Sequence, residues 1–150
     1  MPYGLATAGD VLTAANVNLL PRGRVAFQTN STATNSGVSA AFADVGPTVT
    51  FTALANRRYR ATVTISRIDS SVANTLVVVF ADAASATLAY VGVVTVGAGS
   101  STALSASYEI TPAAGSYTVK IRASASSATA ASFQSGGFSS YLIVEDMGGI

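Results

Sequence analysis

The sequence contains no histidine, no cysteine and no tryptophan among its 150 residues. Histidine and cysteine are the side chains that proteins use most often to move protons, attack electrophiles and hold metals. Their absence excludes a histidine-based catalytic triad, thiol catalysis and the common zinc sites. It also excludes disulfide bonds. The composition therefore favours a protein that acts through its shape and surface rather than through a chemical reaction.

Charged residues are also scarce, with seven acidic and eight basic side chains and a net charge of +1. The sequence has no basic stripe that could follow a phosphate backbone, so we do not expect nucleic acid as a partner. A chain with almost no net charge and a positive mean hydropathy is poorly soluble as a free monomer. The composition therefore predicts assembly, with much of the surface meeting other copies.

Long apolar runs are missing as well. The longest, Leu76–Ala81, is far shorter than the roughly 20 residues that a membrane-spanning helix requires. Met1–Thr7 has neither the charged nor the apolar region of a signal peptide. We therefore expect a soluble protein or a part of a soluble assembly.

The first 23 residues differ from the rest, which divides the chain into an arm and connector, 1–23, and one domain, 24–150. Thr13 is a suitable N-cap for a brief helix, and Pro21 would end it. A helix of this length is not stable alone. The arm is therefore expected to dock on its own domain or on a neighbouring molecule.

From Arg24 onward the hydrophobic pattern has the period of strands. The clearest case is Tyr59–Ser66, in which apolar residues alternate with Arg, Thr and Ser. The sequence predicts about eight strands: Arg24–Thr29, Thr48–Thr52, Tyr59–Ser66, Leu76–Phe80, Leu88–Val96, Leu104–Ile110, Tyr117–Ala123 and Tyr141–Glu145. Gly92 predicts a bulge or a close backbone approach.

Between these strands the sequence predicts loops at Asn30–Ser39, Asp82–Ala86, Gly97–Ser100 and the Ala/Ser/Thr tract Ala123–Ser132. The last strand is expected to end before Gly148. No long helix and no internal repeat is visible. The predicted fold class is all-β: a single antiparallel β-sandwich, jelly roll or barrel with a short N-terminal arm that contains a brief helix.

Few segments could carry chemistry. Gly97–Ser100 resembles a phosphate-binding loop but lacks its Lys-Ser/Thr, so it is interpreted as a hairpin turn. Glu145 and Asp146 are neighbours on a strand, where they point to opposite faces, so they are interpreted as a solvated strand end. Three further acidic residues could converge on Ca²⁺, but without the spacing of a known calcium loop: Asp44, Asp69 and Asp82. We therefore expect no catalytic residue, no cofactor and no metal site.

Two groups of residues could bind a partner. Arg58 and Arg60 would share one face of a strand, where they could bind an anionic partner or pair with carboxylates across a subunit boundary. The alternative is a charged strand entry that stays solvated or pairs with Asp and Glu nearby. The strand tyrosines are more consistent with packing than with a sugar-stacking platform: Tyr59, Tyr108, Tyr117 and Tyr141.

Three segments resemble one group of proteins. Thr7–Asn18 contains the run Gly-Asp-Val-Leu-Thr-Ala-Ala-Asn, Arg57–Arg60 leads into an alternating strand, and Tyr141–Gly148 closes the chain. Together they resemble small all-β virion structural proteins of tailed bacteriophages, particularly those of actinobacterial hosts. The arm motif is the most specific of the three segments.

The resemblance implies a non-enzymatic structural subunit on the exterior of the virion, of the capsid-decoration or minor tail type. It implies a homotrimer or a subunit on a symmetric lattice, with major capsid or tail proteins as partners. Attachment would bury the apolar residues of the arm, Leu12, Val17, Leu19 and Leu20.

Two alternatives remain open at this point. The first is a carbohydrate-binding module that attaches to a glycan of the host surface. The second is a polysaccharide hydrolase, which needs two carboxylates about 5–9.5 Å apart.

Overall fold

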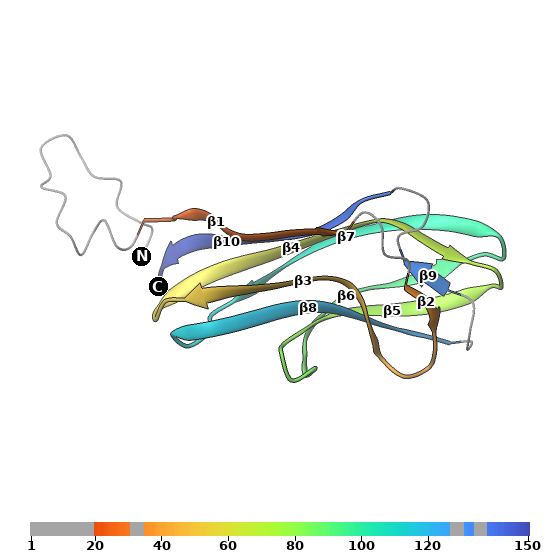
Figure 1. Cartoon of the computed structure of the whole chain (residues 1–150), viewed down its shortest axis with the longest axis horizontal. Helices are drawn as coiled ribbons and strands as arrows, with labels where there is room; N and C mark the ends of the chain where they lie inside the picture. Colours follow the sequence, from red (N-terminus) through yellow and green to blue (C-terminus); the bar gives the residue numbers. More distant parts are fainter. Residues whose placement is uncertain (1–19, 31–34, 127–130, 134–137) are drawn as a thin grey trace, which may run out of the picture.

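The computed structural model describes residues 20–30, 35–126, 131–133 and 138–150, and these residues form two antiparallel sheets packed face to face. The sandwich is much longer than it is thick, and both ends of the described chain lie at the same narrow end (Figure 1). The predicted arm helix, with Leu12, Val17 and Leu19, lies outside the described residues.

Ten strands make up the described part of the chain. In chain order they are β1 (Gly23–Asn30), β2 (Asn35–Val38), β3 (Ala43–Ala53), β4 (Arg57–Ser70), β5 (Asn74–Ala81), β6 (Thr87–Val96), β7 (Ser100–Ile110), β8 (Gly115–Ala125), β9 (Ala131–Phe133) and β10 (Ser140–Gly149).

The pairing of the eight longer strands is that of a jelly roll. One sheet has the order β1-β10-β4-β7 and the other β3-β8-β5-β6, and every pair is antiparallel. Numbered 1 to 8 without β2 and β9, the orders are 1-8-3-6 and 2-7-4-5, which is the arrangement of two interlocked Greek keys. The short strands β2 and β9 pair with each other, and β9 extends the first sheet beside the end of β4. The predicted all-β sandwich is confirmed.

The core lies between the sheets and follows the alternation of the sequence. In β4 the predicted inward residues Tyr59, Ala61, Val63 and Ile65 are all buried, and their neighbours are only partly buried. Val49 and Phe51 of β3 are buried as well. Because each fully buried large apolar side chain contributes roughly 1.5–3 kcal/mol, this alternation fixes which face of each strand turns inward.

The turn between β3 and β4 is held by the core itself. Asn56 adopts a left-handed φ of 57°, which Asn tolerates better than most residues. The backbone N–H of Leu54 donates a hydrogen bond of 2.8 Å to the hydroxyl of the buried Tyr59.

Three boundary predictions are wrong. The expected loop Asn30–Ser39 contains β2, and the Ala/Ser/Thr tract Ala123–Ser132 contains the end of β8 and the start of β9. These segments form strands because backbone hydrogen bonds to a neighbouring strand need no distinctive side chains. The last strand does not end before Gly148 but runs to Gly149, with a bulge between Asp146 and Gly148 and a φ of 106° at Gly148.

Candidate functional site

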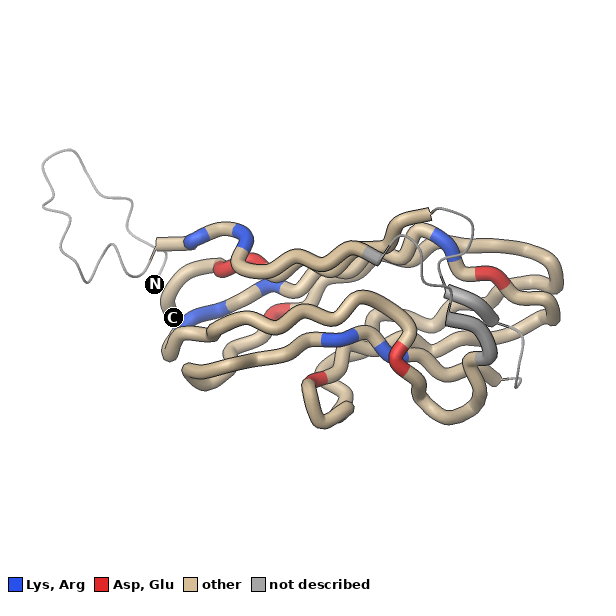
Figure 2. The backbone as a smooth tube through the Cα atoms, in the orientation of Figure 1, with Lys and Arg blue, Asp and Glu red and all other residues tan. Residues whose placement is uncertain are grey.

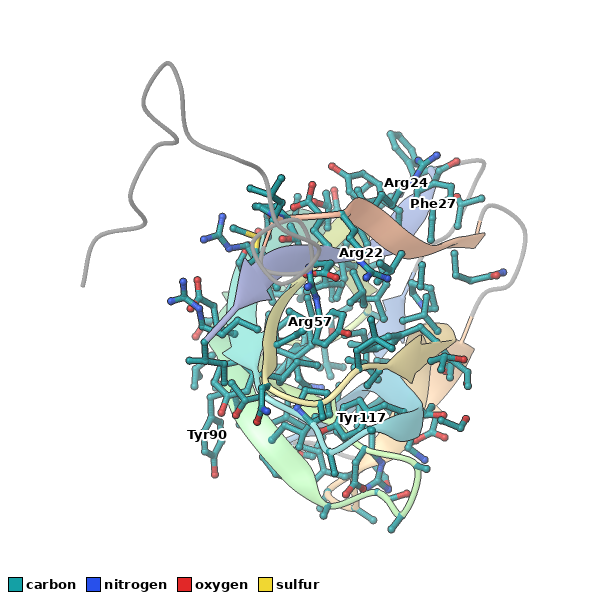
Figure 3. All side chains as sticks on the ribbon, turned by 90° about the vertical axis from the view of Figure 1, so that its left-hand side faces the viewer. Arg22, Arg24, Phe27, Arg57, Tyr90 and Tyr117 are labelled. Atoms are coloured by element: carbon teal, nitrogen blue, oxygen red, sulfur yellow. The ribbon has the colours of Figure 1, made fainter. Side chains whose placement is uncertain are left out.

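A buried ion pair lies at the end of the sandwich from which the N-terminal segment leaves. Arg57 at the start of β4 donates two hydrogen bonds to Asp146 of β10, from Nε to Oδ2 at 2.7 Å and from Nη2 to Oδ1 at 2.8 Å. Arg57 is 4% exposed and Asp146 2% exposed. Seen end-on, Arg57 lies between the two sheets (Figure 3). This geometry is the bidentate pairing in which an arginine and a carboxylate bind most strongly.

The same arginine also holds the base of the arm. Its Nη2 donates a hydrogen bond of 2.6 Å to the backbone carbonyl of Leu20. The side chain of Leu20 remains 52% exposed. The carboxylate of Asp146 is held in turn by its own strand, because the backbone N–H of Gly148 donates a hydrogen bond of 2.9 Å to Oδ1. We call Leu20, Arg57, Asp146 and Gly148 the arm root.

The sequence predicts a solvated strand end at Asp146. This prediction is wrong, because the side chain of Asp146 is buried. Glu145 and Asp146 do point to opposite faces, as expected for neighbours on a strand, but only Glu145 faces outward. Asp146 turns into the sandwich, where Arg57 compensates its charge.

Arg58 and Arg60 share the outer face of β4, as predicted, and both reach one carboxylate on β7. Glu109 lies 3.0 Å from Arg60 and 3.9 Å from Arg58. In the strand register, Arg24, Glu145, Arg60 and Glu109 follow one another across β1, β10, β4 and β7. The outer face of this sheet thus carries a row of alternating charge, and the arginines pair within their own chain.

The outer face of the other sheet carries a second charged group. Asp44 of β3 pairs with Lys120 at 3.2 Å and with Arg122 at 2.9 Å, both on β8. The same two cations bind the Asp82–Ala86 turn, through the hydroxyl and the carbonyl of Ser85. Figure 2 shows how sparse the charges are, with long uncharged stretches between these groups.

The acidic residues do not gather. Asp69 pairs with Arg67 at 2.8 Å, and Asp82 accepts a hydrogen bond from the N–H of Ala86 in its own turn. Asp44 lies on β3 with its two cations. Across the described residues, no three acidic, histidine or cysteine side chains come together to hold a metal ion.

The tyrosines chosen from the sequence mostly serve packing. Tyr59 is buried against Phe51, with ring centroids 4.9 Å apart, and Tyr117 packs on the same ring at 6.0 Å. Burial raises the pKa of Tyr117, and the charge of Asp82 raises it further. Tyr108 stacks on Phe80 at the open side of the sandwich, and Tyr141 lies 6.4 Å from Phe27 on the outer face.

Two strongly exposed apolar residues of one strand are not among those singled out from the sequence. Tyr90 is 72% exposed and Val93 is 65% exposed, both on the edge strand β6. Figure 3 shows Tyr90 projecting from the molecule on the side away from Arg24 and Phe27. The alternation of β6 is interrupted by two register shifts against β5, so its residue pattern does not indicate which side chains face outward. The buried partners Arg57 and Asp146 had no sequence signal either, because they lie 89 residues apart.

Comparisons with known proteins indicate similarity at the level of fold. No family model matches the chain, and no curated protein matches it. Among solved structures, Eiger TNF from S. frugiperda is 14% identical with a TM-score of 0.49, covering 86% of this chain and 96% of that one. The cyanophage Pam1 capsid asymmetric unit is 17% identical with a TM-score of 0.42, covering 98% and 99%.

A third structure, the T13 IBDV viral particle, is 14% identical with a TM-score of 0.44, and the match covers 85% of this chain but 36% of that one. At these identities and scores the comparison concerns strand arrangement and carries no argument about activity. The described residues include no helix with the length and apolar character needed to cross a membrane.

Proposed function

We propose that this chain is a non-enzymatic structural protein of a bacteriophage virion, on the particle exterior, as a capsid-decoration or minor tail subunit. It attaches through its N-terminal arm and through contacts between subunits in a homotrimer. The observation that carries the proposal is the arm root, in which a buried ion pair holds the carbonyl of Leu20. The resemblance of Thr7–Asn18 and of the closing segment to such proteins supports it.

The energetics of the arm root favour a positional role. Removing two charges from water costs several kcal/mol per ion, and a buried pair often stabilises a fold no more than apolar residues would. The Arg57–Asp146 pair does something that apolar residues could not do, since the guanidinium also binds the Leu20 carbonyl. The pair thereby fixes the position of Leu20 at the end of the sandwich.

An arm with a fixed base is suited to docking. Leu20 already presents its side chain to solvent, and Leu12, Val17 and Leu19 are the further apolar residues of the arm. Each such side chain contributes roughly 1.5–3 kcal/mol when fully buried, before the cost of ordering the arm. Linking several arms in one oligomer raises the effective concentration of each, so modest contacts give durable attachment.

Deletion of residues 1–19 tests the proposal while leaving Leu20 and its hydrogen bond in place. Virions would be purified from cells that produce either the full chain or the truncated chain, and the bound protein measured by quantitative mass spectrometry. The truncated chain is expected to fold, shown by its circular dichroism and unfolding midpoint, but to be absent from particles. Normal loading of the truncated chain would refute attachment through the arm.

A second candidate function is carbohydrate binding at the host surface. The observation that favours it is the outer-face pair of Phe27, 47% exposed, and Tyr141, with Arg24 5.1 Å from the centre of the Phe27 ring. Aromatic rings beside a polar group are the usual contacts for a sugar. A glycan array would show binding that Phe27→Ala abolishes and Tyr90→Ala leaves intact. The absence of any bound glycan would exclude this function.

A further inference from the structure

The two edge strands β6 and β7 form one long side of the sandwich. Within the described chain, β6 pairs only with β5 and ends the second sheet, while β7 pairs with β4 and ends the first. The two strands pack on each other at Gly92, where a Cβ atom would lie 3.3 Å from Cδ1 of Leu104. We call this surface, Thr87–Val96 with Ser100–Ile110, the β6–β7 side.

The β6–β7 side carries one charged residue, Glu109, and has exposed apolar side chains on β6, whereas β7 exposes mainly serine. Tyr90 and Val93 pair with Val79 and Val77 of β5, and they remain largely exposed although Val79 is buried. Leu104 and Tyr108 fill the gap between the two edges and remain partly exposed. Thr87–Val96 contains no charged residue and no proline. An edge strand of this kind, with unpaired backbone groups and exposed apolar side chains, is a template for pairing with another chain.

The opposite long side has the protections that β6 lacks. There β1 is preceded by Pro21 and Arg22 and carries Arg24, and it is bulged at Val25. Its neighbour β3 carries Asp44 and a break in the ladder at Pro47. Charges, proline and bulges are the devices by which proteins block edge-to-edge association. On β6 only the bulges are present, within its first half.

We propose that the β6–β7 side is the contact surface between copies of this chain, with Tyr90 and Val93 at its centre. The charge distribution identifies the occupant. The uncharged centre meets its own copy without like charges facing each other, and the rim offers Arg58, Arg60 and Glu109, which carry both signs. A rim with both signs is complementary to itself, whereas a strongly acidic or basic partner would find no matching field. This surface would be the subunit contact named in the proposed function, and the inference rests on that function only for the place where the oligomer works.

The oligomeric state of the full chain tests this inference. Analytical ultracentrifugation at micromolar concentration is expected to give a multiple of the single-chain mass of 15.0 kDa. Val93→Asp places a charge at the centre of the surface and is expected to give the single-chain mass at the same concentration. Val25→Asp, which changes the same residue type on the edge strand β1, is the matched control and is expected to keep the oligomer.

Circular dichroism and thermal unfolding check that the variants are folded. If Val93→Asp does not fold, the mass of Tyr90→Ser in analytical ultracentrifugation tests the inference instead. A single-chain mass for the wild type, or an unchanged oligomer in both folded variants, would overturn the inference. Its failure is distinct from failure of the proposed function. A monomer whose loading on particles depends on residues 1–19 would refute this surface and leave the virion role intact.

Discussion

The two long sides of the sandwich are built from the same kind of strand and differ in how their edges are treated. The β1–β3 side carries Arg24, Asp44 and proline, and its neighbouring strand β10 is locked to β4 by the buried pair of Arg57 and Asp146. The β6–β7 side has no charged residue and no proline on β6 and exposes Tyr90 and Val93 there. The difference teaches that the edge strands of one side are protected against pairing with another chain, whereas β6 on the other side has fewer such protections.

The largest expected effect comes from breaking the buried pair beside the first of these sides. Asp146→Ala leaves the Arg57 guanidinium buried without its carboxylate, which costs about 3–5 kcal/mol. The measurement is the free energy of unfolding from a denaturant titration. The double variant Arg57→Met with Asp146→Leu removes both charges and is expected to be more stable than Asp146→Ala. A loss below about 1 kcal/mol in the single variant would show that the pair is not buried as described.

A matched pair of glycines compares how tightly the two sides are packed. A Cβ at Gly46 of β3 would lie 3.0 Å from Cβ of the buried Ile121, so Ile121 must give by a few tenths of an ångström at an atom attached directly to its backbone. Gly46→Ala is expected to cost about 1–3 kcal/mol. At Gly92 of β6 the nearest atom is the flexible end of Leu104 at 3.3 Å, so Gly92→Ala is expected to cost less than about 1 kcal/mol. Equal losses in the unfolding free energies would remove this distinction between the sides.

The charged groups of the two sides allow a finer comparison. Asp44 binds Lys120 and Arg122, whose side chains are 12% and 20% exposed, whereas Glu109 binds arginines that are more open to water. Asp44→Asn is expected to cost about 1 kcal/mol and Glu109→Gln about 0.3 kcal/mol. Repeating the titrations in high salt should shrink the smaller effect further, because exposed pairs are screened. A larger loss of unfolding free energy in Glu109→Gln than in Asp44→Asn would contradict this order.

The smallest expected effect is a change in stability at alkaline pH. The pKa of Tyr117 is raised above 10.0, first by burial and then by the charges of Asp82 and Tyr108. The folded chain thus keeps this proton to a higher pH than the unfolded chain. Stability is unaffected below about pH 10 and falls as the pH rises toward the folded-state pKa. Tyr117→Phe should lose less stability than the wild type over this window, measured as melting temperature against pH. Identical pH profiles would contradict the assignment.

The sequence predicted the fold wherever apolar residues alternate cleanly. In β4 the apolar residues of the predicted alternation are the buried ones, because alternation of buried and exposed positions is a local property of a strand. The bulge or close approach expected at Gly92 is present as well, with a register shift beside it and Leu104 against it. By contrast, β2 and β9 went unnoticed, since their pairing depends on a distant strand rather than on their own side chains.

The same distinction applies to the candidate site. Arg58 and Arg60 could be placed on one face from their spacing alone, although their partner Glu109 could not be named. Arg57 belongs to the same cluster and differs from its neighbours only in facing inward. Whether an inward arginine meets a carboxylate depends on how β10 is threaded between β1 and β4, and no local pattern encodes that.

The threading of β10 also imposes an order of events on synthesis. In the described structure β1 finds its sheet partner in β10, and Asp146 of that same strand completes the grip of Arg57 on Leu20. A nascent chain on the ribosome has released its arm long before Ser140–Gly149 has been translated. Until β10 has joined the sheet, the Arg57 side chain that binds the carbonyl of Leu20 lacks its partner Asp146. The position of Leu20, early in the sequence, is therefore set only after a strand far along the chain has joined the sheet.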